Sequence, residues 1–136
     1  MMFITFYLSD FLFALPVEDV LEIKKSAEIT KVPLSPPYIE GIINLRGQII
    51  TAIHLAKKLG LRFEDTKNNY HHIIVKTSQE PISIMVEEIG DVINIDKKDL
   101  EPVPDHLEGI DVKYIKNISK LSDRLLIVLD PEAIKG

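Results

Sequence analysis

The chain is a succession of short apolar runs, rich in β-branched and aromatic residues and separated by residues that favour turns. Residues 3–8 and 11–15 make the first pair, with the turn formers Ser9-Asp10 between them. We expect further strands at residues 22–24, 39–45, 48–53, 73–76, 82–86, 89–95 and 110–115, and residues 121–129 are predicted to surround a Ser122-Asp123 turn. Runs this short, spaced roughly eight to twelve residues apart, predict many short strands and exclude long helices.

Helical turns are expected at only a few places. Residues 16–20 begin with a proline that suits a first helical turn, and residues 55–60 have the composition of a short helix closed by a glycine. A last short helix is predicted at residues 131–134, and the polar residues 64–69 are predicted to be a loop. The fold class is therefore all-β, either a barrel or a sandwich.

Composition narrows the class of protein. The length of 136 residues suits one folding unit, and 46% hydrophobic with 27% charged residues is typical of a folded chain. The absence of cysteine excludes disulfides, thiolate metal sites and a cysteine nucleophile, and it suits the cytoplasm. A net charge of −5 offers no positive field to nucleic acid, so we expect no nucleic-acid partner.

The apolar amino-terminal segment raises the question of a signal peptide or membrane anchor. Residues 1–17 contain no Lys or Arg, are interrupted by Ser9 and Asp10, and reach Pro16 without a small-x-small cleavage site. No stretch approaches the roughly 20 uninterrupted apolar residues of a membrane-spanning helix. We therefore expect no direct membrane insertion.

Residues 41–50 read GIINLRGQII, which is an apolar strand, the tetrapeptide Asn-Leu-Arg-Gly and a second apolar strand. This arrangement resembles the central signature of the CheW family, and other elements from residues 20–23 to 125–130 follow the order of that family. The resemblance implies two SH3-like five-stranded β-barrels packed together, with the chain ends contributing to the first barrel. It implies one domain over residues 1–136, whose halves do not fold separately because a barrel of roughly 65 residues is marginal.

The resemblance also implies a function. Members of the CheW family couple methyl-accepting chemoreceptors to the histidine kinase CheA without catalysing a reaction. One surface binds the regulatory domain of CheA, and a groove near the barrel junction binds the cytoplasmic signalling tip of the chemoreceptor. By this resemblance we expect no cofactor and a location in the cytoplasm at receptor arrays. The chain length leaves no room for kinase, phosphotransfer or receiver domains, so we expect a standalone adaptor.

Seven residues that match the family pattern are the candidates for partner contact. They are Val20, Glu22, Gly41, Asn44, Leu45, Arg46 and Gly47. Arg46 is expected to project its guanidinium from a tight turn that Gly47 permits, although a merely solvated arginine is the plainer alternative. Val20 and Glu22 would lie on one side of a strand, where Val20 could equally be core and Glu22 merely solvated. Gly41 would allow either close strand packing or close approach of a partner helix.

Two pairs of neighbouring polar residues raise the question of a metal site or a catalytic acid/base pair. His71 and His72 are neighbours, and neighbours on a strand face opposite sides, so no metal site is expected. Glu87 and Glu88 diverge in the same way, and no nucleophile or oxyanion motif accompanies them. We therefore expect no catalytic site.

Other functions stay open at this point. A small β-barrel rich in apolar residues could bind a small ligand, and an OB-like barrel could bind nucleic acid, although the basic groove with interleaved aromatics is missing. The chain could also be an adaptor of a divergent chemosensory pathway, because the family commonly has a proline and an aspartate where this chain has Thr51 and His54.

His54 bears on helix stability as well. A helix starting at Leu55 would lack a good aspartate N-cap, a change typically worth about 1 kcal/mol. We predict from the sequence that His54→Asp raises the melting temperature.

Overall fold

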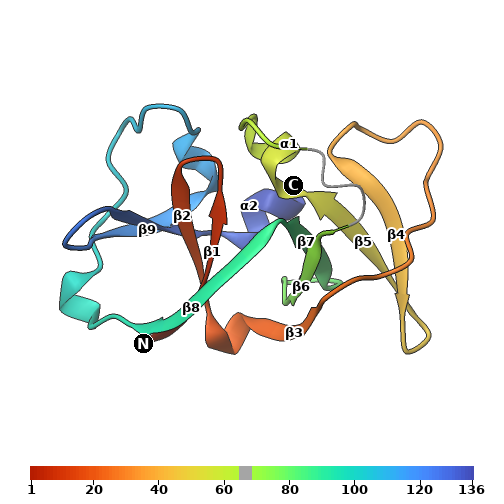
Figure 1. Cartoon of the computed structure of the whole chain (residues 1–136), viewed down its shortest axis with the longest axis horizontal. Helices are drawn as coiled ribbons and strands as arrows, with labels where there is room; N and C mark the ends of the chain where they lie inside the picture. Colours follow the sequence, from red (N-terminus) through yellow and green to blue (C-terminus); the bar gives the residue numbers. More distant parts are fainter. Residues whose placement is uncertain (65–68) are drawn as a thin grey trace.

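The computed structural model describes residues 1–64 and 69–136, and the strands in these residues form two five-stranded sheets (Figure 1). Sheet A has the order β8-β1-β2-β10-β9, and sheet B has the order β3-β6-β7-β5-β4. The strands of sheet A are β1 (Met2–Leu8), β2 (Phe11–Pro16), β8 (Glu88–Asn94), β9 (Ile115–Lys120) and β10 (Leu125–Leu129). The strands of sheet B are β3 (Val20–Lys24), β4 (Ile39–Leu45), β5 (Gln48–His54), β6 (His71–Val75) and β7 (Ile82–Val86).

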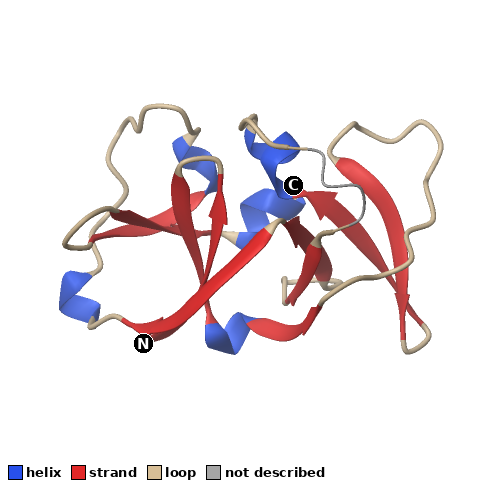
Figure 2. Ribbon diagram, in the orientation of Figure 1, coloured by secondary structure: helices blue, strands red, loops and turns tan. Residues whose placement is uncertain are grey.

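Helices are short in the described part of the chain (Figure 2). They are the α-helices α1 (Leu55–Leu59) and α2 (Pro131–Lys135), and the 3-10 turns η1 (Val17–Asp19), η2 (Lys97–Asp99) and η3 (Val112–Tyr114). The predicted all-β fold class, with paired five-stranded units and few helices, is confirmed. Most of the loop predicted at residues 64–69 lies outside the described residues.

Both ends of the chain contribute to sheet A. Strands β1 and β2 form the predicted amino-terminal hairpin, in which Phe3 pairs with Pro16 and Leu8 pairs with Phe11. Strand β10 pairs with β2 in parallel, and β9 pairs with β10, so the carboxyl-terminal strands complete the sheet that the amino-terminal strands begin. All the strands of sheet B come from the stretch of sequence between β2 and β8. The chain therefore begins in sheet A, forms sheet B and then returns to complete sheet A.

The largest apolar core joins the two sheets. It combines residues such as Phe13 and Ile127 of sheet A with Ile73 and Ile84 of sheet B, all of them at most 1% exposed. Each sheet also has a smaller apolar cluster on the face turned away from this shared core. The cluster of sheet A lies around Phe3, and the other lies within sheet B. Separating the sheets would expose the shared core, so this packing agrees with the prediction that the halves do not fold alone, which stays a prediction.

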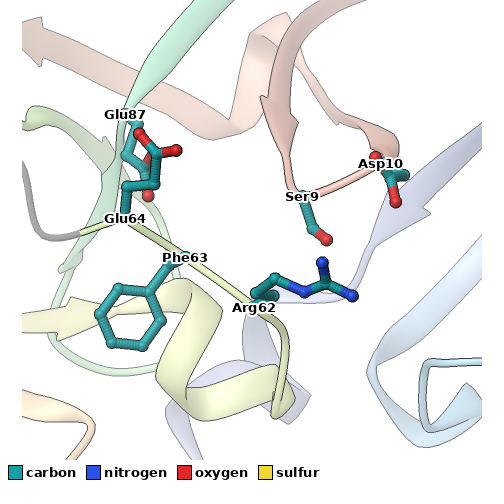
Figure 3. A pocket seen from close by; sticks show the side chains of 6 residues that line it. All are labelled: Ser9, Asp10, Arg62, Phe63, Glu64 and Glu87. Carbon is teal, nitrogen blue, oxygen red and sulfur yellow. The ribbon is translucent and has the colours of Figure 1, made fainter.

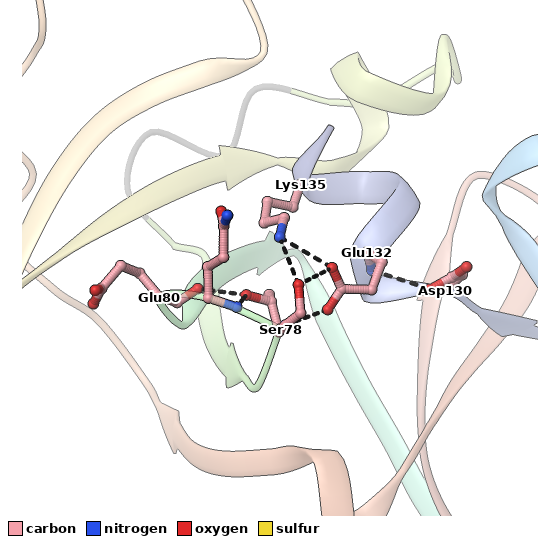
Figure 4. Close-up of polar contacts among 7 residues, drawn as sticks. Ser78, Glu80, Asp130, Glu132 and Lys135 are labelled. Atoms are coloured by element: carbon pink, nitrogen blue, oxygen red, sulfur yellow. Dashed lines mark hydrogen bonds and ion pairs between the residues drawn. The ribbon is translucent and has the colours of Figure 1, made fainter.

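Helix α2 ties the end of the chain to sheet B (Figure 4). The Glu132 carboxylate accepts hydrogen bonds from the backbone N–H and the hydroxyl of Ser78, which lies between β6 and β7. Lys135 Nζ donates to Ser78 Oγ at 3.2 Å and lies 3.0 Å from Glu132 Oε2. The bonds from Lys135 and then Ser78 lower the pKa of Glu132, so this contribution to stability is lost as the pH falls below about 4.5.

One strand prediction was wrong. Residues 110–115 alternate between apolar and polar side chains, but they contain the 3-10 turn η3, and the strand begins only at Ile115. The Asp111 carboxylate accepts a hydrogen bond of 3.0 Å from the backbone N–H of Lys113. This side-chain hydrogen bond stabilises a turn of the backbone, which then does not pair as a strand. The alternation of apolar and polar residues does not indicate such a bond.

Leu34 is exposed and strained. Its side chain is fully exposed, and its backbone has a φ of 61°, a left-handed conformation that costs L-residues about 1–2 kcal/mol. We expect Leu34→Asn to raise the free energy of unfolding by about 0.5–1 kcal/mol, because asparagine tolerates this conformation. Urea denaturation measures the change. Leu21→Asn, on the exposed side of β3, is the control and should give no gain; an equal gain at both positions would contradict the backbone argument.

The structure corrects the expectation about His54. Its imidazole is the N-cap of α1, since Nδ1 accepts a hydrogen bond of 3.2 Å from the backbone N–H of Lys57. The side chain is buried, its Nε2 lies 3.1 Å from the Tyr70 hydroxyl, and its ring lies 4.5 Å from the ring of Phe63. The N-cap of α1, which was expected to be missing, is therefore supplied by histidine.

We now expect His54→Asp to lower the melting temperature. Aspartate would replace one cap by another, while the contacts of the buried ring with Phe63 and Tyr70 would be lost and a carboxylate would be placed in an apolar site. The expected loss is about 1–3 kcal/mol. Thermal denaturation measures it, and His54→Asn separates the loss of packing from the burial of charge. A higher melting temperature for His54→Asp would restore the sequence-based expectation.

Candidate partner-binding site

The Asn44–Gly47 segment forms the two-residue turn between β4 and β5. Arg46 has a φ of 51° and Gly47 a φ of 85°, and positive φ at both central residues is the geometry that matches the twist of paired strands. The Asn44 side chain accepts a hydrogen bond of 2.8 Å from the backbone N–H of Gly47. Leu45 is buried in the smaller cluster of sheet B, so it anchors the turn to the sheet while Arg46 is exposed.

Arg46 contacts Glu22, another of the predicted residues. Its Nη2 atom donates to Glu22 Oε1 at 2.9 Å, and the two residues are 24 positions apart in the sequence. The Arg46 side chain is 74% exposed and that of Glu22 is 27% exposed. The second carboxylate oxygen of Glu22 is buried without a hydrogen-bond partner among the described residues. The ion pair therefore joins the turn to β3 and holds the guanidinium at the surface.

Val20 and Gly41 both lie where they contribute to the packing of the protein itself. Val20 is half-buried and packs against the shared core, which matches the plainer of its two interpretations. Gly41 has a φ of 149°, and a Cβ atom there would lie 2.2 Å from the backbone oxygen of Thr30 and 2.8 Å from Ile29 Cγ2. Of the two roles considered for Gly41, close strand packing matches this geometry, because its own chain occupies the space beside it.

The comparisons with known proteins decide the family. Residues 2–135 match the CheW-like domain family. The chain belongs to this family. It is 32% identical over 133 residues to the chemotaxis protein CheW of Helicobacter pylori, covering 97% of this chain and 79% of that protein. It is also 32% identical over 134 residues to the chemotaxis protein CheW of Thermotoga maritima, covering 96% and 85%.

A solved CheW structure has the same fold. The scaffolding protein TtCheW from Thermoanaerobacter tengcongensis superimposes with a TM-score of 0.91 and 34% sequence identity, covering 98% of this chain and 90% of that one. The resemblance drawn from residues 41–50 is thus confirmed, and the chain is a CheW-like chemotaxis scaffold protein.

Three exposed apolar side chains, on β3 and just after the Asn44–Gly47 turn, were not predicted from the sequence. Leu21 is 50% exposed, Ile23 is 38% exposed, and both flank Glu22 on β3. Ile49 is 55% exposed and follows the Arg46-Gly47 turn by two residues. The signal was available, because β3 has apolar residues on both of its faces and only one face can meet the core. Exposed apolar groups such as these are typical of protein contact surfaces.

A polar hollow lies where the two halves of this CheW-like domain meet (Figure 3). Its volume is about 260 Å³, and it is lined by the Ser9-Asp10 turn of sheet A, residues 62–64 after α1, and Glu87. Arg62 extends towards Ser9, while Glu64 and Glu87 lie together at the other end. Burial and then the charge of Glu64 raise the pKa of Glu87. The resemblance implied a receptor groove near the barrel junction; this hollow lies at that junction, and most of its lining is charged.

The two neighbouring histidines have different environments. His72 is buried and its Nδ1 lies 2.9 Å from Ser83 Oγ, while His71 is partly exposed, so the two rings do not converge. Among the described residues no three His, Asp or Glu side chains are grouped so as to hold a metal ion.

None of the described helices has the length and apolar character needed to cross a membrane.

We expect His72 to make the stability depend on pH. Burial, followed by the charges of Lys24 and His71, lowers the pKa of His72 from its ordinary 6.5. The unfolded chain therefore binds a proton below about pH 6.5 that the folded chain does not, and the free energy of unfolding falls as the pH drops from there. His72→Gln should show a shallower decrease between about pH 7 and 5 in urea titrations. Equal slopes for both proteins would contradict this assignment.

Proposed function

We propose that this CheW-like protein is a non-catalytic adaptor that links the cytoplasmic signalling tips of chemoreceptors to the regulatory domain of the histidine kinase CheA. Membership of the CheW family supports the adaptor role. The proposal places the protein in the cytoplasm, at receptor arrays, where it would be held by its partners. Binding both partners at once raises the effective concentration of each for the other, so no chemical step at a substrate is required.

The observation that carries the proposal is the presentation of Arg46. Its left-handed backbone costs about 1–2 kcal/mol, and an exposed ion pair such as that with Glu22 returns at most about 1 kcal/mol. Folding therefore gains nothing from arginine at this position, whereas asparagine or glycine would fit the turn without strain. An exposed arginine held in a costly conformation is suited to contact with a partner.

The surroundings of Arg46 supply both kinds of contact. Ile49, two residues beyond the turn, offers apolar area, Leu21 and Ile23 offer more on the face of β3 opposite Glu22, and the Arg46–Glu22 pair offers groups that can orient a partner. A helix of the receptor tip, with apolar residues on one face, is a suitable partner for such a surface. We place receptor contact here and kinase contact on another face, because simultaneous binding needs two separate surfaces.

Isothermal titration calorimetry against the isolated regulatory domain of the CheA kinase from the same genome tests the proposal. We expect saturable 1:1 binding, and co-sedimentation of the ternary mixture with receptor fragments embedded in vesicles. The same titration with the phosphotransfer domain of that kinase is the control and should show no heat of binding. Absence of binding to the regulatory domain at high micromolar concentration would contradict the adaptor role.

A further inference from the structure

A hollow at one end of sheet A has an apolar floor. It lies where β1 begins and β2 ends, and its volume is about 390 Å³. Phe3 and Val128 lie in its lining, and both are 1% exposed, so they belong to the core of sheet A. Leu100, beside η2, adds a partly exposed apolar wall. This floor and wall can receive one apolar side chain.

Cationic groups surround the same hollow. Lys97 of η2 and Lys116 of β9 line it, both are exposed, and neither has a carboxylate partner in the part of the chain that the structure describes. Met1 also lines it, and the amino-terminal ammonium donates to Asn94 Oδ1 at 3.2 Å and to Ile95 O at 2.9 Å. In a chain with a net charge of −5, this grouping is a local positive field around an apolar hollow.

The acidic neighbours do not cancel this field by pairing. Asp96 and Asp99 flank the two lysines of η2 in the sequence but do not line the hollow, and Glu101 lies 3.7 Å from Lys120. The hollow is also separate from the Arg46 site, because it is built from sheet A and the segment after β8, whereas Arg46 and Glu22 belong to sheet B. It is therefore a second place where the molecule can recognise a partner.

We propose that this hollow binds an acidic peptide segment of a partner protein, with one apolar side chain in the hollow and adjacent carboxylates against Lys97 and Lys116. The charges require an anionic occupant, and the apolar floor requires an apolar group beside the anion. Phe3 and Val128 are each only 1% exposed, so the apolar surface that an occupant can reach is small and suits a single side chain. The inference rests on the proposed function only in taking the occupant to be a protein segment.

Fluorescence anisotropy with a labelled probe peptide, Asp-Glu-Leu-Phe-Glu-Asp, tests the proposal on the full chain. We expect saturable binding to the wild type and at least tenfold weaker binding to Lys97→Glu and to Lys116→Glu. Lys98→Glu is the matched control, because Lys98 lies in the same 3-10 turn and does not line the hollow, and it should bind as the wild type does. A second peptide with serines in place of Leu-Phe should bind at least tenfold more weakly.

The location is checked by nuclear magnetic resonance. Backbone amide shifts of Phe3, Leu100 and Val128 should move on titration with the probe, while those of Glu22 and Arg46 should not. No saturable binding of the probe, equal binding to Lys97→Glu and Lys98→Glu, or binding of octanoate without binding of the peptide would each overturn the proposal. None of these outcomes depends on the CheA titration, so failure here and failure of the adaptor role are distinguishable.

Discussion

Arg46→Glu is expected to weaken binding of receptor fragments by roughly 30-fold or more, equivalent to about 2 kcal/mol, with little change in the stability of the fold. The guanidinium is exposed at the tip of a turn, so a partner that it contacts would meet a carboxylate in its place. The ion pair with Glu22 would be replaced by repulsion between two carboxylates, which costs at most about 1 kcal/mol at an exposed site. Co-sedimentation measures binding, and urea denaturation measures stability.

Two further variants separate contact from structure. Glu22→Arg combined with Arg46→Glu restores an ion pair of opposite sign, so it should be as stable as the wild type without recovering binding. Arg124→Glu is the control, because Arg124 precedes β10 of sheet A and also lies beside a carboxylate, that of Asp123 at 3.5 Å. Recovery of binding by the double variant would mean that binding requires the ion pair between the two positions and not the guanidinium of Arg46 itself.

Gly41→Ala is expected to lower the free energy of unfolding by about 3 kcal/mol or more, which is the largest stability effect that we predict. The added Cβ would lie 2.2 Å from the carbonyl oxygen of Thr30, and the φ of 149° is one that L side chains rarely adopt. Thr30 and Ile42 form an isolated bridge with backbone hydrogen bonds of 2.8 and 2.9 Å, so the carbonyl cannot move away without breaking them. Urea denaturation measures the loss.

Gly47→Ala provides the matched control for Gly41. Gly47 also has a positive φ, of 85°, but a Cβ there would meet nothing within 4 Å. We expect it to cost about 1 kcal/mol, the strain alone. Equal losses at the two glycines would show that the backbone conformation, and not the contact with Thr30, decides the effect.

The features of the fold that were predicted correctly depend on residues that are close together in the sequence. The Ser9-Asp10 hairpin, the Arg46-Gly47 turn, and helices α1 and α2 each depend on residues within a few positions of one another. The Asn-Leu-Arg-Gly turn also led to the family, because its residues are contiguous in the sequence. The seven predicted contact residues stay predictions as contacts, although the structure joins two of them, Glu22 and Arg46, in an ion pair.

The errors arose where a side chain competed with the backbone or met a distant neighbour. Asp111 converts an alternating segment into a 3-10 turn through one hydrogen bond. His54 caps α1 although histidine is not among the preferred caps, because the rings of Phe63 and Tyr70 hold it in place. The exposed positions of Leu21 and Ile23 depend on which face of β3 meets the core, and that face is chosen by packing.

The sequence by itself determined the short strands, the turns between them and the family, since these depend on residue type and on neighbours along the chain. Only the tertiary structure decided that β10 lies beside β2 in parallel, that Thr30 fills the space beside Gly41, and that Lys97 and Lys116 surround one hollow. Such contacts join segments that are separated in the sequence, and each is selected by the burial of the whole core. No pattern of neighbouring residues records them.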